Sequence, residues 1–246
     1  METLVLDSAA EVAQLVATRI IDAVSANPQL VLGLATGSTP LPSYREVLRQ
    51  SASRGVDFGQ VQVVMLDEYL GLAQNSENSY RSFIKQNLTD ELGIAESRLH
   101  TLNGLAADPE LECQVFEDRI AKLGGVDLQV LGIGVNGHIA FNEPGTPPES
   151  LTHVVTLAES TRLSNAKFFE DLSQVPTRAL TQGIGTILKA KETLLIGTGS
   201  NKAAAVASAL EMPPSLVVPA SQLQRHHNCT AVLDQAAASK LQLTAG

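Results

Sequence analysis

Residues 30–40 read LVLGLATGSTP, a nearly continuous apolar run that leads into a polar turn containing glycine. A short apolar run of this kind is typical of a β-strand that is buried on both faces, as in a parallel sheet. A helix-like stretch follows over residues 43–53, and Gly55 closes it. The stretch therefore predicts a buried strand, a turn and a helix in succession.

The same succession recurs along the chain. An earlier helix begins with capping-box spacing at Ser8 and Glu11 and ends before Pro28. Further strand-like runs lie at residues 61–66, 128–133, 193–196, 216–218 and 231–233, and further helical patterns lie at residues 80–88, 109–123, 203–210 and 236–241. Strands that alternate with helices predict one α/β domain over residues 1–246, a three-layer Rossmann-like fold with a mostly parallel central sheet.

Composition excludes several classes of protein. The chain has 246 residues, 44% of them hydrophobic, which is enough for a large buried core. Its formal net charge of -9 disfavours nucleic acid and anionic membrane as partners, because both attract basic surfaces. The two cysteines, Cys113 and Cys229, form no CxxC pair, so we expect reduced thiols rather than disulfides or a cysteine zinc site.

Targeting features also bear on location. The N-terminus has no basic leader, and no apolar run approaches the ~20 residues that a membrane span needs. We therefore expect a cytoplasmic protein. The sequence leaves its oligomeric state open, a homo-oligomer included.

Polar segments follow four of the strand-like runs. In an open parallel sheet, ligands bind beyond the carboxyl ends of the strands, so these segments could meet in one crevice. Two of them, residues 37–40 and 197–202, contain glycines and hydroxyl groups, which suit a phosphate at a helix start, and Lys202 adds a cation. Residues 37–40 are equally compatible with an ordinary capped turn, and residues 197–202 taken alone favour a solvated lysine at a helix start.

The other two segments carry acid–base groups. Asp67 and Glu68 follow an apolar strand, where burial would raise the pKa of a carboxyl toward that of a general base; a solvated acidic turn is the alternative. His138 can transfer protons near neutral pH, and Asn136 or Glu143 could orient it. His138 and Glu143 lack a third ligand at a recognisable spacing, so we expect no metal site.

These stretches resemble the glucosamine-6-phosphate deaminase family. The resemblance rests on LGLATGSTP (32–40), MLDEY (65–69) and GIGVNGHIAFNEP (132–144), with weaker matches at SNAKFF (164–169), ALTQGIG (179–185) and GSNK (199–202). It implies an isomerase/deaminase that converts glucosamine 6-phosphate and water to fructose 6-phosphate and ammonia, without a cofactor.

The resemblance also implies roles for individual residues. Asp67 would move the proton from C2 toward C1, and His138, oriented by Glu143, would open the sugar ring. Phosphate would be held by Gly37, Ser38, Thr39, Lys167 and Lys202. A ring-closed sugar has no carbonyl, so ring opening must precede removal of the C2 proton and needs its own acid–base group.

The chain departs from the family pattern at two positions. Asn136 stands where some members carry Asp, which leaves Glu143 to stabilise an imidazolium by charge. Lys167 stands where arginine is expected, so the bidentate fork is lost. Residues 143–161 contain no Lys or Arg. We therefore expect no activation of the kind that N-acetylated sugar phosphates exert on some members.

Two other functions compete with this interpretation. 6-Phosphogluconolactonases share the fold, but Tyr69 and the ending Asn142-Glu143-Pro144 favour the deaminase. A sugar-phosphate sensor of a transcriptional regulator would need a basic DNA-binding segment, and this acidic chain begins its α/β pattern by residue 8. The loop at residues 143–149 is rich in Pro and Gly and suggests the hinge of a lid, which we expect over about residues 144–182.

Overall fold

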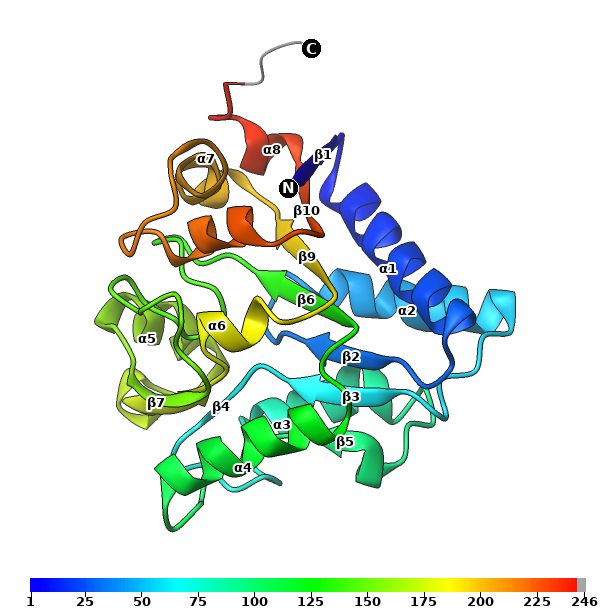
Figure 1. Cartoon of the computed structure of the whole chain (residues 1–246), viewed down its shortest axis with the longest axis vertical. Coiled ribbons are helices and arrows are strands. Elements are labelled where there is room, and N and C mark those ends of the chain that lie inside the picture. Colours follow the sequence, from blue (N-terminus) through cyan, green and yellow to red (C-terminus); the bar gives the residue numbers. More distant parts are fainter. Residues whose placement is uncertain (243–246) are drawn as a thin grey trace.

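The computed structural model describes residues 1–242 of the chain. Its centre is a seven-stranded sheet with the order β1-β10-β9-β6-β2-β3-β5, in which every neighbouring pair is parallel (Figure 1). The strands are β1 (Glu2–Leu6), β2 (Val31–Leu34), β3 (Gln62–Met65), β5 (Leu99–His100), β6 (Leu128–Gly132), β9 (Glu192–Gly197) and β10 (Cys229–Asp234). The predicted α/β class with a mostly parallel central sheet is confirmed.

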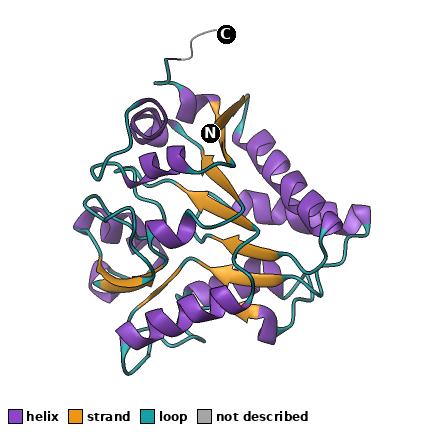
Figure 2. Cartoon of the chain, viewed as in Figure 1, coloured by secondary structure: helices purple, strands orange, loops and turns teal. Residues whose placement is uncertain are grey.

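Helices cover both faces of this sheet (Figure 2). On one face lie α1 (Ala9–Ala26) and α2 (Leu41–Arg54), and on the other α4 (Pro109–Lys122), α6 (Ile184–Ile187), α7 (Ala203–Glu211) and α8 (Gln235–Ala238). Successive side chains of a strand point to opposite faces. Leu32 therefore packs in the cluster of α1 and α2, whereas its neighbour Val31 packs in the cluster of α4.

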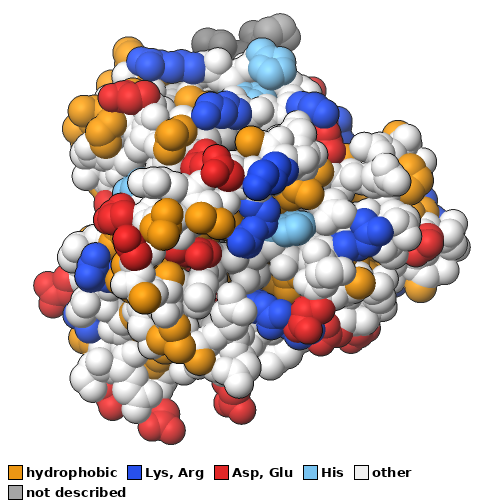
Figure 3. All heavy atoms as spheres, turned by 60° about the horizontal axis from the view of Figure 1, so that its bottom comes forward, with side chains coloured by type: hydrophobic (Ala, Val, Ile, Leu, Met, Phe, Trp, Pro, Cys, Tyr) orange, Lys and Arg blue, Asp and Glu red, His pale blue; other side chains and the backbone are white. Residues whose placement is uncertain are grey.

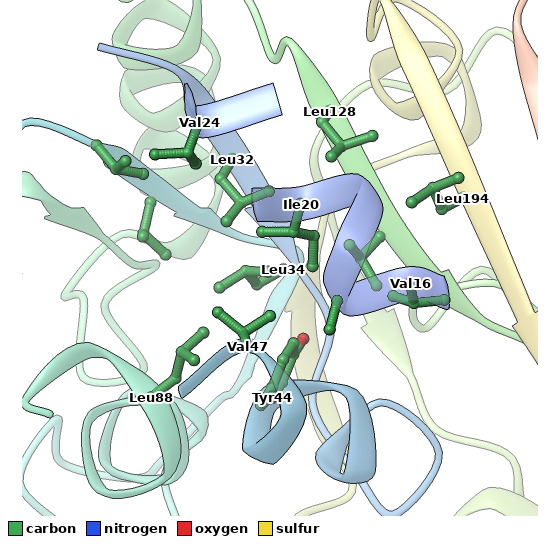
Figure 4. Packing of buried hydrophobic residues seen from close by; sticks show 14 of the residues in the cluster. Val16, Ile20, Val24, Leu32, Leu34, Tyr44, Val47, Leu88, Leu128 and Leu194 are labelled. Atoms are coloured by element: carbon green, nitrogen blue, oxygen red, sulfur yellow. The ribbon is translucent and has the colours of Figure 1, made fainter. Parts of the chain in front are cut away.

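The core on the first face explains why those helices bind the sheet. Figure 4 shows Val16, Ile20 and Val24 on one side of α1, directed at the leucines of the strands. Each is at most 1% exposed. Fully burying a side chain of this size contributes about 1.5–3 kcal/mol, so the apolar stripe of α1 outweighs its weak capping contacts. The helical spacing in the sequence reports this stripe directly.

Local signals place the helix ends. The Ser8 hydroxyl accepts a hydrogen bond from the Glu11 amide, as the capping-box spacing predicts. Gly55 ends α2 with a φ of 65°, a left-handed conformation that glycine adopts without strain. The Asp108 carboxylate caps α4 by accepting the amides of Glu110 and Leu111.

A second, antiparallel sheet was not expected from the sequence. It consists of β4 (Asp67–Tyr69), β8 (Arg178–Thr181) and β7 (His153–Thr156), in the order β4-β8-β7. The chain passes from β3 into β4 through Leu66, so Asp67 and Glu68 lie in a buried strand of this sheet and not in the solvated turn that was the alternative. Its partner β8 is distant in sequence, and only the tertiary fold brings the two together.

Residues 144–182 lie beyond the carboxyl ends of the central strands, on the left of Figure 1. They contain β7, α5 (Glu159–Asn165), the 3-10 helices Ala166–Phe168 and Leu172–Gln174, and β8. A hydrogen bond joins the beginning of this segment to the chain just after its end: the Gly185 amide donates to the Ser150 carbonyl oxygen at 2.8 Å. The remaining helices are α3 (Tyr80–Ile84), which continues into a π-helical turn (Lys85–Thr89), and the 3-10 helices Glu96–Arg98, Ser200–Lys202 and Pro219–Arg225.

One local expectation is wrong. Residues 216–218 form no strand but lead into the 3-10 helix Pro219–Arg225, because prolines on both sides remove backbone donors that a sheet would need. His226, which directly follows that 3-10 helix, is 4% exposed. Its ring contacts the Ala190 carbonyl oxygen at 2.7 Å and accepts the Asn228 amide at 3.0 Å. Across residues 1–242, no helix combines the length and apolar character needed to cross a membrane.

Candidate active site

A cleft of about 470 Å³ opens at the carboxyl ends of β2, β3 and β6. The strand order places β2 between β3 and β6, so the chain turns in opposite directions on the two sides of β2. This is where open α/β sheets form a ligand crevice. The cleft is lined by residues 35–40, by Asp67, Tyr69 and Tyr80, by residues 132–136 and His138, and by Thr161, Asn165, Lys167 and Lys202 among others.

The loop after β2 forms one wall of the cleft. Gly37 has a φ of 98°, a conformation that a side chain would strain, and it turns the chain from β2 toward α2. The buried Tyr44 hydroxyl of α2 donates a hydrogen bond to the Ala35 carbonyl oxygen and holds the start of the loop. Ser38 and Thr39 thereby present hydroxyl and backbone N–H groups to the cleft.

Asp67 is a buried carboxylic acid at the floor of the cleft. Its side chain is 6% exposed, and its Oδ1 atom has no hydrogen-bond partner among the described residues. Burial raises the pKa of the Asp67 carboxyl well above its ordinary value, and the neighbouring Glu68 charge raises it further. An unpartnered carboxylate with a raised pKa suits proton abstraction from carbon.

Glu68 has a structural role and is not free to act as a base. Its carboxylate accepts hydrogen bonds from the amides of Tyr69, Tyr80 and Arg81, all within 3.0 Å. Burial raises the pKa of the Glu68 carboxyl, and the three backbone donors oppose that rise. Glu68 therefore fixes β4 to the start of α3, which leaves Asp67 as the free acid of the pair.

His138 lies at the end of a tight turn after β6. A Cβ atom on Gly134 would lie 2.3 Å from the imidazole, so the ring needs glycine at that position. The His138 amide donates to Asn136 Oδ1 at 3.2 Å, and His138 Nδ1 lies 3.7 Å from Glu143 Oε2. Burial lowers the pKa of the His138 imidazole, Glu143 opposes this shift, and Lys202 adds to it. His138 is consequently neutral near pH 7 and able to accept or donate a proton.

Aromatic side chains form a wall behind these groups. Tyr69 and Tyr80 join their hydroxyl groups at 3.2 Å, and their rings pack against Phe141 and Phe169. Burial raises the pKa of Tyr69 to about 12, so its hydroxyl stays protonated as a donor. Sequence reasoning assigned no site role to Tyr80 or Phe169, because only tertiary packing brings their rings to the cleft.

Two lysines lie close to each other in the lining and form a cationic end of the cleft. Lys167 Nζ donates to Ser38 Oγ at 3.4 Å, which links the 144–182 segment to the loop after β2. Burial lowers the pKa of the Lys202 ammonium, and the nearby Lys167 charge lowers it further. Two cations that disfavour each other are stabilised by an anion between them, so this end of the cleft suits a phosphate group.

The loop that carries Lys202 is held by Asp234 at the end of β10. The Asp234 carboxylate accepts the Gly199 amide at 3.0 Å and the Ala237 amide at 2.7 Å. The face shown in Figure 3 carries Lys and Arg side chains close together near its middle, beside a histidine. A local group of cations thus faces solvent on a chain whose formal net charge is -9.

The structure brings together the residues that the sequence singled out. Asp67, Asn136, His138, Gly37, Ser38, Thr39, Lys167 and Lys202 all line this cleft. Glu143 lies just behind it, where its Oε2 accepts the Asn136 side-chain amide at 2.8 Å. Within residues 1–242, no three His, Cys, Asp or Glu side chains gather in a way that would hold a metal ion.

Comparison with known families gives one match over most of the chain. Residues 6–232 match the family described as glucosamine-6-phosphate isomerases/6-phosphogluconolactonase. A glucosamine-6-phosphate deaminase of Arthrobacter sp. (strain FB24) is 46% identical over 99% of this chain and 94% of its own length. The glucosamine-6-phosphate deaminase 2 of Giardia intestinalis is 47% identical over 94% of this chain and 88% of its own.

Solved structures agree with the sequence matches. A structure described as a monomeric glucosamine-6-phosphate deaminase is 42% identical, with a TM-score of 0.96 over 98% of this chain and 100% of that one. The 6-phosphogluconolactonase of Trypanosoma cruzi is 22% identical, with a TM-score of 0.76 over 98% of this chain and 97% of its own. At that identity the second likeness concerns the fold alone.

Proposed function

Because the chain belongs to the glucosamine-6-phosphate isomerase/6-phosphogluconolactonase family, we propose that it is a glucosamine-6-phosphate deaminase. The enzyme converts glucosamine 6-phosphate and water to fructose 6-phosphate and ammonia. One observation carries this proposal: a buried, unpartnered carboxylate and a histidine line the same cleft as two lysines. Deamination of a hexose phosphate needs a base for the C2 proton, an acid–base group for ring opening and cations for the phosphate.

Ring opening comes first in the proposed reaction. His138 moves the protons between the ring oxygen and the O1 hydroxyl, and the Glu143 carboxylate stabilises the imidazolium when it forms. Asn136 contributes through its amide, which orients Glu143, and through its Oδ1 atom, which accepts the His138 amide. Opening the ring creates the C1 aldehyde that makes the C2 proton acidic.

Isomerisation follows at Asp67. Its carboxylate removes the C2 proton and returns a proton to C1, which leaves an imine at C2. Water adds to this imine, and ammonia leaves. The buried position of Asp67 supports this role, because a desolvated carboxylate is a stronger base toward carbon than a hydrated one.

Phosphate binding positions the sugar for both steps. The loop at Gly37, Ser38 and Thr39 and the side chains of Lys167 and Lys202 hold the phosphate at the opposite end of the cleft. Binding energy from this remote group orients C1 and C2 against the acid–base residues. The reaction so described uses no cofactor or metal ion.

Two further features belong to this proposal. The chain acts as one domain, because both helical layers share the central sheet, and residues 144–182 act as a lid over the cleft. Thr161, Asn165 and Lys167 of that segment line the cleft, which supports its covering role. A cytoplasmic location fits a substrate whose phosphate charge keeps it from crossing membranes.

Lactone hydrolysis is the alternative that shares this fold. A lactonase activates water at an ester carbonyl and has no carbon acid to deprotonate, so it has no need for a buried carboxylate such as Asp67. The Tyr69 hydroxyl and the Asn142-Glu143-Pro144 sequence also favour the deaminase. Asn142 is fully buried, and its amide joins the Ile139 and Gln182 carbonyl oxygens, which fixes the turn that carries His138.

The test offers both substrates to the purified chain. We expect glucosamine 6-phosphate to yield ammonia and fructose 6-phosphate in equal amounts, and 6-phosphogluconolactone to hydrolyse no faster than it does without enzyme. Glucose 6-phosphate serves as a control that has the phosphate but lacks the C2 amine. Enzyme-dependent lactone hydrolysis without ammonia release would reverse the assignment.

A further inference from the structure

Thr161 contacts Glu143, the carboxylate beside His138, although it does not belong to the loops at the strand ends. It lies on α5, within the 144–182 segment, and is 4% exposed. Its hydroxyl donates a short hydrogen bond to Glu143 Oε1. The chain thus brings a helix of the covering segment into direct contact with the carboxylate behind His138.

The two oxygens of Glu143 have different partners. Oε1 accepts the Thr161 hydroxyl, whereas Oε2 accepts the Asn136 amide at 2.8 Å. His138 Nδ1 lies 3.7 Å from the same Oε2 atom, beyond hydrogen-bond distance. Nδ1 is buried and has no hydrogen-bond partner among the described residues. The contact that would orient the imidazole is therefore close to forming but not formed.

A small rotation of the Glu143 carboxylate would close this contact. With Oε1 held by Thr161, the carboxylate turns about that oxygen, and Oε2 moves between the Asn136 amide and His138 Nδ1. Without the Thr161 hydroxyl, only the Asn136 amide holds the carboxylate, which then has more orientations that miss the imidazole. Hydrogen bonds from neighbours commonly fix the groups that orient a catalytic histidine.

We propose that Thr161 is a positioning residue: its hydroxyl holds Glu143 in the orientation from which it can engage His138, so proton transfer depends on α5 lying over the cleft. This role rests on the proposed deaminase function. Thr161 acts through Glu143 and transfers no proton itself. When residues 144–182 enclose the substrate, they would at the same time orient Glu143 toward His138, the group that opens the ring.

Other charged groups face the same histidine. Glu143 and Lys202 both contribute to the pKa of His138, and Lys167 lies near Lys202. The Glu143 charge raises the pKa of His138 only while the carboxylate faces the imidazole. Removing the Thr161 hydroxyl while the Lys202 loop stays in place is therefore expected to lower the pKa of His138.

The experiment compares Thr161→Val, which keeps the shape but loses the hydroxyl, with Thr161→Ser, which keeps the hydroxyl. We expect the valine variant to lose about tenfold in kcat, the lower range for a hydrogen bond to a charged group, with KM within about twofold. The serine variant should recover most of the loss. Thr177→Val is the matched control, since Thr177 is exposed on the same segment, and it should leave both constants unchanged.

A second measurement is independent of turnover. The pKa of His138 is followed by NMR titration of the free enzyme, and we expect it to fall in Thr161→Val and to return in Thr161→Ser. An unchanged or raised His138 pKa in Thr161→Val, or equal losses in both variants, would overturn the positioning role. If the unmodified chain releases no ammonia, the proposed function fails, while the titration still tests the link from Thr161 to His138.

Discussion

The two ends of the cleft are built on different principles. At the acid–base end, Asp67 is 6% exposed and rests on a strand, and burial shifts the pKa values of Asp67 and His138 in opposite directions. At the phosphate end, Lys167 and Lys202 come from short 3-10 helices, and Lys167 is exposed. The first end controls protonation, and the second supplies charge.

This difference separates catalysis from binding. Desolvated groups are costly to bury and are retained where a shifted pKa is useful. An exposed cation such as Lys167 costs little to place and gains most of its interaction energy when an anion arrives. Substitutions at the acid–base end should therefore change kcat, and substitutions at the phosphate end should change KM.

The largest expected effect is that of Asp67→Asn. The amide keeps the shape of the side chain but cannot take the C2 proton, so kcat should fall by about 10²–10⁴, the range for general acid–base groups, with little change in KM. Steady-state release of ammonia measures both constants. Full retained activity would remove Asp67 from the mechanism.

The melting temperature of Asp67→Asn shows whether a loss of activity comes from misfolding. Because the folded-state pKa of Asp67 lies above the unfolded value, folding takes up a proton, and stability increases as pH falls through the folded pKa. The neutral amide has no such cost, so Asp67→Asn should melt at a higher temperature than the parent chain at neutral pH. Lower stability together with lower activity would point to misfolding instead.

Lys202→Met addresses the phosphate end. Loss of the ammonium should raise KM for glucosamine 6-phosphate by roughly 10- to 100-fold, as expected for a charge-assisted hydrogen bond, with a smaller loss in kcat. Inorganic phosphate should also become a weaker competitive inhibitor. A large fall in kcat at unchanged KM would contradict the separation of the two ends.

The pH profile of the unmodified enzyme tests the acid–base end without substitution. Asp67 must be deprotonated to act as a base, so kcat/KM should fall as pH decreases through its raised pKa. The acid limb should therefore lie clearly above about 3.9, the ordinary value for aspartate. A limb at the ordinary value would show that burial does not tune this carboxylate in solution.

Lys167→Arg should have the smallest effect. A guanidinium could grip two phosphate oxygens in parallel, so KM should fall by about two- to fivefold while kcat stays constant. The gain is limited because this side chain is exposed and solvent screens its charge. Lys167→Gln is the companion variant, and it should raise KM. An arginine variant that binds more weakly would indicate that the site is shaped for lysine.

Much of the architecture could be predicted because it follows local patterns. Buried parallel strands appear as apolar runs, as at residues 30–35, and helices appear through capping residues and apolar spacing, as from Ser8 onward. The resemblance to the deaminase family, carried by residues 132–144, is confirmed by the family match and by relatives above 40% identity. The roles of the individual site residues stay predictions.

Other features carried no local signal. The strand at Asp67 depends on β8, which lies far along the chain, and the buried position of His226 depends on the Ala190 carbonyl oxygen. Thr161 has nothing in its neighbours that marks it, because its partner Glu143 belongs to another loop. Apolar residues 216–218 suggested a strand, and flanking prolines prevented it.

The amino-acid sequence on its own determined which groups this protein has for chemistry, since residue types and strand-end positions are encoded locally. The tertiary structure alone decided their protonation and partners: which carboxylate of the Asp67-Glu68 pair is left unpaired, and which oxygen of Glu143 faces His138. The physical reason is that desolvation and hydrogen bonding depend on every atom packed around a group, and most of those atoms come from distant parts of the chain.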